Sequence, residues 1–273
     1  MLELPDVTLV CVDTREPAFA LLAMRRTMAG MRFGDAVLFT ESARLGEQPE
    51  GIRVVDVRVD TIEAYSAFML RGLAERTHTS HLLVVQWDGF ATRPQHWSFE
   101  FLRWDYIGAR WHDRPPELSV GNGGFSLRSR RLLIALQDPQ IRISHPEDIC
   151  ICLHNRERLE RHHGICIAPP ALAERFAYER LPPQQSTFGF HGLFNFAHEL
   201  EPNDLAKTLQ VLPDHLARGL DAHDLCRMLV RHGQLDLAQL LLDKRRRLRM
   251  HDRRTLRLVA QLWWARRRSA PIG

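Results

Sequence analysis

The residues best suited to chemistry are acids and histidines that stand far apart in the chain. Asp88 follows an apolar run at residues 81–85, and a carboxylate at the end of a buried strand can bind Mg²⁺ or Mn²⁺, cations that take oxygen ligands. Glu147 and Asp148 are adjacent, and a carboxylate that faces a hydroxyl group can remove its proton. His191 stands among aromatic residues and glycines, and neutral histidine is a common metal ligand. These residue types predict a site that combines a divalent cation with proton transfer.

A glycine cluster at residues 121–124 adds a second kind of signal. Three of its four residues are glycine, which opens the backbone to close approach by another molecule, so Gly123 and Gly124 are candidate binding residues. The spacing and context differ from those of the dinucleotide-binding fingerprint. A hairpin or a β-bulge would also explain the glycines.

Each of these residues also has a purely structural explanation. An Asp after a strand is commonly a turn or helix-capping residue. Adjacent acids at the start of a helix commonly cap it and interact with its dipole. A single histidine among the 14 of this chain can be a partly buried loop residue. No single residue therefore decides the function, and the order of the signals along the chain matters more.

The first part of the chain alternates predicted strands and helices. We expect strands at residues 7–12, 36–39, 52–57 and 81–85, and helices at residues 18–28 and 62–75. This alternation predicts an α/β fold with a Rossmann-like, mainly parallel sheet flanked by helices. Ligands of such sheets bind outside the carboxyl ends of the strands. The residues that follow the first and fourth strands should therefore form two edges of one crevice: Asp13, Thr14 and Arg15, and Gln86, Trp87 and Asp88.

The region after Asp88 is less regular. We expect a strand-like stretch at residues 125–127, helices at 129–136 and 146–161, and a short strand at 164–168. Three arginines, Arg128, Arg130 and Arg131, either bind phosphate groups through charge-assisted hydrogen bonds or form a solvated helix face.

Charge divides the chain into two parts. From residue 200 onward there are 15 Lys/Arg against 8 Asp/Glu, a balance of +7, whereas the first 199 residues carry 22 basic and 25 acidic groups, a balance of −3. We therefore predict an α/β domain at residues 1–199 and a basic, all-helical appendage at residues 200–273. Because the main body is net acidic and carries no recognised nucleic-acid motif, we expect no nucleic-acid partner.

The appendage ends in an apolar helix flanked by arginines. Trp263 and Trp264 precede Arg266, Arg267 and Arg268, and basic residues beside tryptophan suit an anionic membrane surface. The alternative is a helical cap that packs on the main body or on a second copy of the chain. The sequence thus leaves peripheral membrane contact and self-association both open.

Cysteine usage and hydropathy favour a cytoplasmic protein. The five cysteines are odd in number and lie mostly in apolar stretches, which is typical of buried free thiols in a reducing compartment. No signal peptide opens the sequence, and no apolar run approaches the roughly 18 residues of a spanning helix. We expect a cytoplasmic location, with the inner membrane face as the place of any peripheral contact.

Five segments together resemble a known family: residues 86–90, 105–109, 120–129, 146–148 and 188–192. They are similar to a bacterial domain-of-unknown-function family, number 5672, which in turn resembles glycosyltransferases of the GT-A type. The resemblance covers residues 7 to 192, and its most specific part is the glycine-rich segment. It implies a GT-A-like catalytic domain that transfers a sugar from a nucleotide-sugar donor to a carbohydrate or glycoconjugate acceptor. The first candidate for the donor is a UDP-sugar.

The resemblance also implies roles for individual residues. Asp88, with His191, would bind Mn²⁺ or Mg²⁺, and Asp148 would be the catalytic base, with Glu147 as the second candidate. A carboxylate base implies a single displacement that inverts the anomeric carbon. The donor would be bound by the remaining residues of the site, Thr14, Arg15, Gln86, Trp87, Gly123 and Gly124. Tryptophans at positions 87, 97, 104 and 111 would stack on sugar rings or else fill the core.

One position departs from the pattern of the GT-A enzymes. The first residue of their D-x-D metal signature is Gln86 here, so only one of the two usual carboxylates is present. This departure favours an alternative in which the chain is a non-catalytic protein of the same fold that recruits partners to polysaccharide assembly.

Overall fold

The computed structural model describes residues 1–46, 48–248 and 252–269, which form two compact units. The first unit is Met1–His191 and the second begins at Gly192. This division lies a few residues before the expected domain boundary at 199/200.

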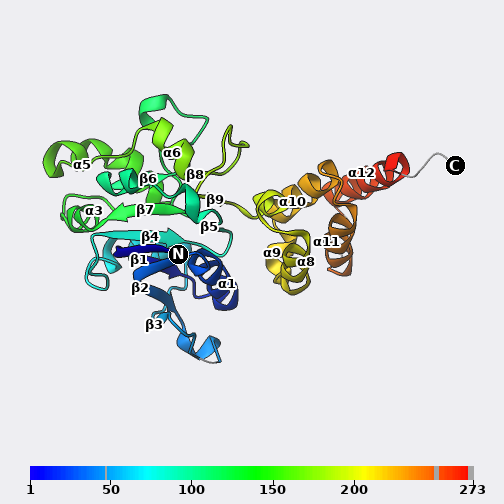
Figure 1. Cartoon of the computed structure of the whole chain (residues 1–273), viewed down its shortest axis with the longest axis horizontal. Coiled ribbons are helices and arrows are strands. Elements are labelled where there is room, and N and C mark those ends of the chain that lie inside the picture. The colour runs from blue at the N-terminus through cyan, green and yellow to red at the C-terminus, as the bar shows by residue number, and fades with distance from the viewer. Residues whose placement is uncertain (47, 249–251, 270–273) are drawn as a thin grey trace. The chain divides into compact units, whose positions relative to one another are not determined.

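The first unit is built on a six-stranded, mainly parallel sheet of the order β3-β2-β1-β4-β7-β6 (Figure 1). Its parallel strands are β1 (Leu2–Val12), β2 (Met31–Thr40), β3 (Arg53–Asp56) and β4 (His81–Val85). On the other side of β4, β7 (Ser126–Ser129) runs antiparallel to both β4 and β6 (Tyr106–Gly108). The predicted α/β class with a mainly parallel sheet is confirmed.

In the described part of the first unit, two helices connect strands of this sheet, and four follow its last strand, β7. They are α1 (Pro17–Met28), α2 (Ile62–Ala67), α3 (Arg130–Ala135), α4 (Glu147–Ile149), α5 (Arg156–His163) and α6 (Pro170–Phe176). The helices expected at 62–75 and 146–161 each contain a π-helical segment, Phe68–Gly72 after α2 and Cys150–His154 after α4. The second of these helices is therefore divided in two.

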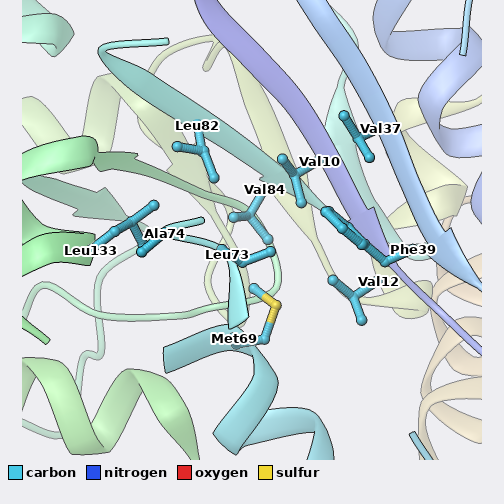
Figure 2. Packing of buried hydrophobic residues seen from close by; sticks show 10 residues of the cluster. All are labelled: Val10, Val12, Val37, Phe39, Met69, Leu73, Ala74, Leu82, Val84 and Leu133. Atoms are coloured by element: carbon cyan, nitrogen blue, oxygen red, sulfur yellow. The ribbon is translucent and has the colours of Figure 1, made fainter. Parts of the chain in front are cut away.

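One face of the sheet carries a cluster of buried apolar residues (Figure 2). Alternate side chains of β1, β2 and β4, such as Val10, Val37 and Val84, point to the same side because successive residues of a strand face opposite ways. Met69 of the π-helical segment and Leu133 of α3 cover them. This packing covers one face of β1 and β4, whose backbone pairing sets the spacing of their carboxyl ends.

A second, three-stranded sheet positions His191. It has the order β5-β9-β8, from β5 (Gly89–Ala91), β9 (Gly189–His191) and β8 (Ala177–Tyr178). In its register Gly89 lies opposite His191, so the histidine comes next to the residue that follows Asp88. A contact between positions about one hundred residues apart is thus made by backbone pairing.

The strand expected at residues 164–168 is wrong. Only one bridge, between Tyr106 and Ile167, forms there. Gly164 adopts a left-handed conformation at the end of α5, and Pro170 already begins α6, so too few extended residues remain for a strand.

The described residues of the second unit form helices and no strand. Its helices are α7 (Phe196–Glu199), α8 (Pro202–Val211), α9 (Asp214–Arg218), α10 (Leu220–Arg231), α11 (Leu235–Arg247) and α12 (Arg253–Ser269). The buried Arg245 of α11 donates hydrogen bonds to the carbonyl of Ala217 at 2.6 Å and to the hydroxyl of Thr255 at 3.3 Å. This one side chain links α9, α11 and α12. Within the described part of the chain, no helix is long and apolar enough to cross a bilayer.

The cysteines are free thiols, as expected, but not all are buried. Cys11, Cys150, Cys152 and Cys226 are buried, whereas Cys166 is exposed although its neighbours Ile165 and Ile167 are buried. Burial raises the pKa of the Cys152 thiol well above its usual value, with the charge of Asp148 adding to the effect.

Candidate functional site

A cleft of about 470 Å³ lies at the carboxyl ends of β1 and β4. Segments far apart in the sequence meet there: residues 12–15, residues 59–65, Gln86 and Trp87, residues 122–124, residues 145–148, Glu179 and His191. Nine of the ten predicted site residues line this cleft. The tenth, Asp88, is buried behind the wall and lies next to His191.

The segment after β1 forms one edge of the cleft. The Asp13 carboxylate accepts hydrogen bonds from the backbone N–H groups of Arg15 and Glu16, each at 2.8 Å, and so shapes the start of α1. The Thr14 hydroxyl donates to the carbonyl of Val59 at 2.7 Å, which ties this edge to the segment before α2. Arg15 is exposed on the rim, where its guanidinium can reach a ligand.

The turn after β4 forms the opposite edge. Gln86 pairs with Gly89 across the turn, and its amide nitrogen donates to the hydroxyl of Tyr65 at 2.8 Å. That bond orients the amide so that its oxygen lies 3.3 Å from Nε2 of His191. Trp87 packs edge-on against Phe19 of α1, which holds the indole at the cleft wall. Gln86 therefore presents an oxygen to the site, even though it is not a carboxylate.

His191 is held from both sides of its ring. Its Nδ1 lies 3.2 Å from Glu179 Oε1, and its Nε2 lies 3.7 Å from Asp88 Oδ1. Glu179 and Gln86 both offer acceptor oxygens to the ring, so a neutral ring donates from Nδ1–H to Glu179 or from Nε2–H to Gln86, and a protonated ring donates from both nitrogens. Burial would raise the pKa of Glu179, but the hydrogen bond and charge of His191 outweigh burial and lower it.

The chemistry of these donors fits a divalent cation that a substrate helps to bind. Among the described residues, no group of three or more His, Cys, Asp and Glu side chains is placed to hold a metal ion by itself. Mg²⁺, however, is commonly bound by one or two carboxylates and completed by substrate phosphates and water. Asp88 Oδ1, His191 Nε2 and the oriented oxygen of Gln86 form such an incomplete set. A carboxylate behind the imidazole, here Glu179, is the usual outer partner of a ligating histidine.

The glycine cluster forms the floor between these groups. The N–H of Gly123 donates to Asp148 Oδ2 at 3.1 Å, and Asn122 adopts a positive φ of 62°. A Cβ atom on Gly123 would overlap with the carboxylate of Glu147, and one on Gly124 would overlap with the imidazole of His191. These two positions must be glycine because protein side chains already occupy the space beside them.

A buried ion pair supports this floor from below. Arg128 is fully buried, and its Nη2 lies 3.2 Å from Glu147 Oε1 and 3.3 Å from the carbonyl of Gly123. Its Nε donates to the hydroxyl of Ser126 at 3.0 Å. Both interpretations of Arg128 made from the sequence are wrong, since it neither lines the cleft nor belongs to a solvated helix face. It lies on β7, whose side chains are all buried.

The two adjacent acids have different surroundings. Glu147 is buried and paired with Arg128, which fixes its position. Asp148 is half-buried at the cleft wall, where Oδ2 accepts from Gly123 N–H and Oδ1 from the N–H of Ile149 at 2.8 Å. A carboxylate has further lone pairs beyond these two bonds, so Asp148 can still accept a proton from a group in the cleft.

Three site residues were missed by sequence reasoning. Tyr65 orients Gln86, Glu179 holds His191, and the Asn122 side chain lies 3.2 Å from His191 Nδ1. Asn122 stands inside the glycine cluster, so its neighbours were a usable signal. Nothing in the local sequence distinguishes Tyr65 or Glu179, because each reaches the site only through the packing of distant elements.

Two of the four tryptophans lie at the cleft, and a third packs among aromatic side chains. Trp87 and Trp111 line the cleft, where an aromatic face is available to a ligand. Trp97 packs edge-on against Phe101 and Phe188 instead, with ring centroids 5.5 and 5.1 Å away. Stacking on a ligand is therefore open to the tryptophans at the cleft, whereas packing inside the protein describes Trp97.

We expect Gly124→Ala to destabilise the protein by about 1–3 kcal/mol, the usual cost of forcing an extra methyl into a packed site. The methyl would occupy the space of the His191 ring, so the histidine must move. Denaturant unfolding measures the cost. In a His191→Ala background the same change should cost clearly less, and an equal cost in both backgrounds would contradict this packing.

The fold and the site together define an α/β protein with a ligand cleft at the carboxyl ends of parallel strands. The chain belongs to the family described as "Protein of unknown function (DUF5672)", whose model matches residues 51–191. The match covers the turn after β4, the glycine cluster, the acidic pair and His191, but not Thr14 or Arg15. No curated protein matches the chain.

Among solved structures, the chain is similar to the apo form of the glycosyltransferase GlyE of Streptococcus pneumoniae TIGR4. The identity is 10%, the TM-score 0.40, and the alignment covers 68% of this chain and 54% of that one, so the chain spans about half its length. It is also similar to a glycosyltransferase involved in glycosylation of the major capsid of PBCV-1, with 11% identity, a TM-score of 0.42, and coverage of 68% and 91%. At this level of similarity no activity follows for this chain.

Proposed function

We propose that the first unit is a glycosyltransferase that moves a sugar from a nucleotide-sugar donor to a carbohydrate or glycoconjugate acceptor. A UDP-sugar is the first candidate for the donor. The observation that carries this proposal is the convergence of Gln86, the glycine cluster, Asp148 and His191 on one cleft at the sheet edge. A cleft in this position is where α/β sheets bind nucleotides. Its volume of about 470 Å³ lies within the range of small-molecule sites.

The roles follow from what each side chain touches. Asp88 and His191, with the oxygen of Gln86, would hold Mn²⁺ or Mg²⁺ together with the donor diphosphate. When bound, the cation supplies positive charge to the leaving diphosphate. Arg15, on the opposite rim, would meet the phosphates or the nucleotide. Thr14 holds that rim through its bond to Val59.

Asp148 is the base in this proposal, and Glu147 is the second candidate. The acceptor hydroxyl loses its proton to the Asp148 carboxylate as its oxygen forms the bond to the anomeric carbon, and the bond to the diphosphate breaks. Attack from the side opposite the leaving group inverts the anomeric configuration. Proton NMR of the first product formed tests this stereochemistry, since a retained configuration would exclude Asp148 as the base of a single displacement.

Donor binding tests the proposal. Purified protein with Mn²⁺ should bind a nucleotide sugar in calorimetry and hydrolyse or transfer it. Asp88→Asn should reduce metal-dependent turnover by at least about tenfold, because it removes the carboxylate beside His191. Asp35→Asn, at the other end of the sheet, is the matched control and should leave turnover unchanged.

The alternative of a non-catalytic protein gives a different result. It predicts nucleotide-sugar binding without turnover across a panel of donors and acceptors. If no nucleotide sugar binds in the presence of metal, the glycosyltransferase proposal is excluded.

A further inference from the structure

The helix α12 has an unusual charge and surface pattern. It contains six arginines and no acidic residue over its 17 residues. Its inner face is buried through Thr255, Leu258 and Leu262, which pack within the helical unit. The helix therefore already has a conventional buried stripe, and its remaining surface faces outward.

The outward face carries a second apolar stripe. Leu256, Ala260, Trp263 and Trp264 follow the i, i+4, i+7, i+8 spacing of one helix face, and all four are exposed. Leu256 is 57% exposed, Trp263 47% and Trp264 58%. An amphipathic helix normally has only one such stripe, so the outer one indicates a surface that becomes covered by something else.

Arginines border this outer stripe. The guanidinium of Arg267 lies 3.9 Å from the ring centroid of Trp263, which holds charge and indole side by side. Arg257 and Arg268 line a groove next to Trp264, together with Arg227 and Arg231 of α10. The outer apolar stripe is therefore bordered by positively charged side chains.

We propose that this face of α12 docks on the surface of an anionic lipid bilayer. Exposed tryptophans bordered by arginines match the two components of such a surface: the indoles enter the boundary of the acyl chains while the guanidinium groups meet the lipid phosphates. The net charge of +7 from residue 200 onward complements the negative surface potential. The inference is independent of the sugar-transfer proposal.

Two other occupants fit the face less well. A second copy would bring two arginine-rich helices together, and like charges across an interface oppose association. A single-stranded nucleic acid could stack on the tryptophans, but it offers nothing to Leu256, which is exposed and aliphatic. An acyl-chain boundary accepts both kinds of side chain.

Vesicle binding of the full chain tests the proposal. The protein should co-sediment with vesicles of phosphatidylglycerol and phosphatidylcholine in equal parts, and not with phosphatidylcholine alone, and added salt should release it. The double variant Trp263→Ser, Trp264→Ser should lower the partition coefficient about tenfold or more. Arg257→Glu with Arg267→Glu should lower it by a similar factor, about tenfold.

The matched control is Val211→Ser with Leu220→Ser, two exposed apolar residues of the same unit that lie outside α12. This variant should bind vesicles like the unchanged protein. Quenching of tryptophan fluorescence by brominated phosphatidylglycerol vesicles provides a measurement that needs no variant, and we expect quenching. Vesicle binding that ignores the tryptophan variant would overturn the proposal. Absence of vesicle binding would also overturn it. In that case, binding of a single-stranded oligonucleotide or dimer formation in light scattering would identify the other occupant of this face.

Discussion

Replacing Asp148 with asparagine is expected to reduce the turnover number for sugar transfer by roughly 10²–10⁴-fold, the usual contribution of a positioned base. The amide oxygen of asparagine can still accept the hydrogen bond from Gly123 N–H that Asp148 Oδ2 accepts at 3.1 Å. The shape of the glycine cluster should therefore persist while the proton acceptor is lost. Steady-state kinetics with the active donor and acceptor measures the effect.

Donor binding separates loss of the base from loss of the site. In calorimetry, Asp148→Asn should bind the nucleotide sugar with nearly unchanged affinity, because the base acts on the acceptor. Glu157→Gln, an exposed neutralisation on α5, should change neither turnover nor binding. If Asp148→Asn keeps full turnover while Glu147→Gln abolishes it, the base is the buried acid and our assignment of the pair is reversed.

Removing the guanidinium of Arg128 should have the largest effect on stability. Arg128→Met leaves Glu147 buried without its partner, and breaking one side of a buried ion pair costs about 3–5 kcal/mol. The variant also loses the hydrogen bond to the carbonyl of Gly123, so the floor of the cleft should loosen. Denaturant unfolding gives the free energy, and calorimetry with the donor reports the state of the cleft.

A double variant distinguishes the ion pair from simple packing. Adding Glu147→Gln to Arg128→Met removes the uncompensated charge and should recover part of the lost stability, because the two residues are directly coupled. Arg58→Met, whose side chain is 80% exposed, should stay within about 0.5 kcal/mol of the unchanged protein. A cost at Arg128 as small as that at Arg58 would show that the pair does not support the cleft.

Strands could be predicted from the sequence where burial is continuous. The apolar runs at residues 7–12 and 81–85 lie in β1 and β4, because a strand buried on both faces needs an uninterrupted apolar sequence. The crevice between their carboxyl ends followed from topology. The interruptions of the two long helices could not be predicted, since no proline or glycine marks where either π-helical segment begins.

The site was predictable only as far as local signals reach. Acids, glycines and a histidine could be recognised as candidates from their residue types and sequence neighbours, and all of them line one cleft except Asp88, which is buried beside it. The role of each residue depends on its contacts with residues that are distant in the sequence. Glu147 differs from its neighbour Asp148 because Arg128, on another element, lies beneath it. Glu179 matters because β8 and β9 pair and bring it to the far side of the His191 ring.

The central claim is that the residues around the cleft form one nucleotide-sugar site. Crystals soaked with UDP, GDP and CDP in the presence of Mn²⁺ test it most directly. We predict density for a nucleoside diphosphate in the cleft, its phosphates between Arg15 and the turn after β4, with a cation at Asp88 and His191. A nucleotide bound elsewhere, or a cleft that stays without nucleotide while the cation binds other residues, would contradict the account.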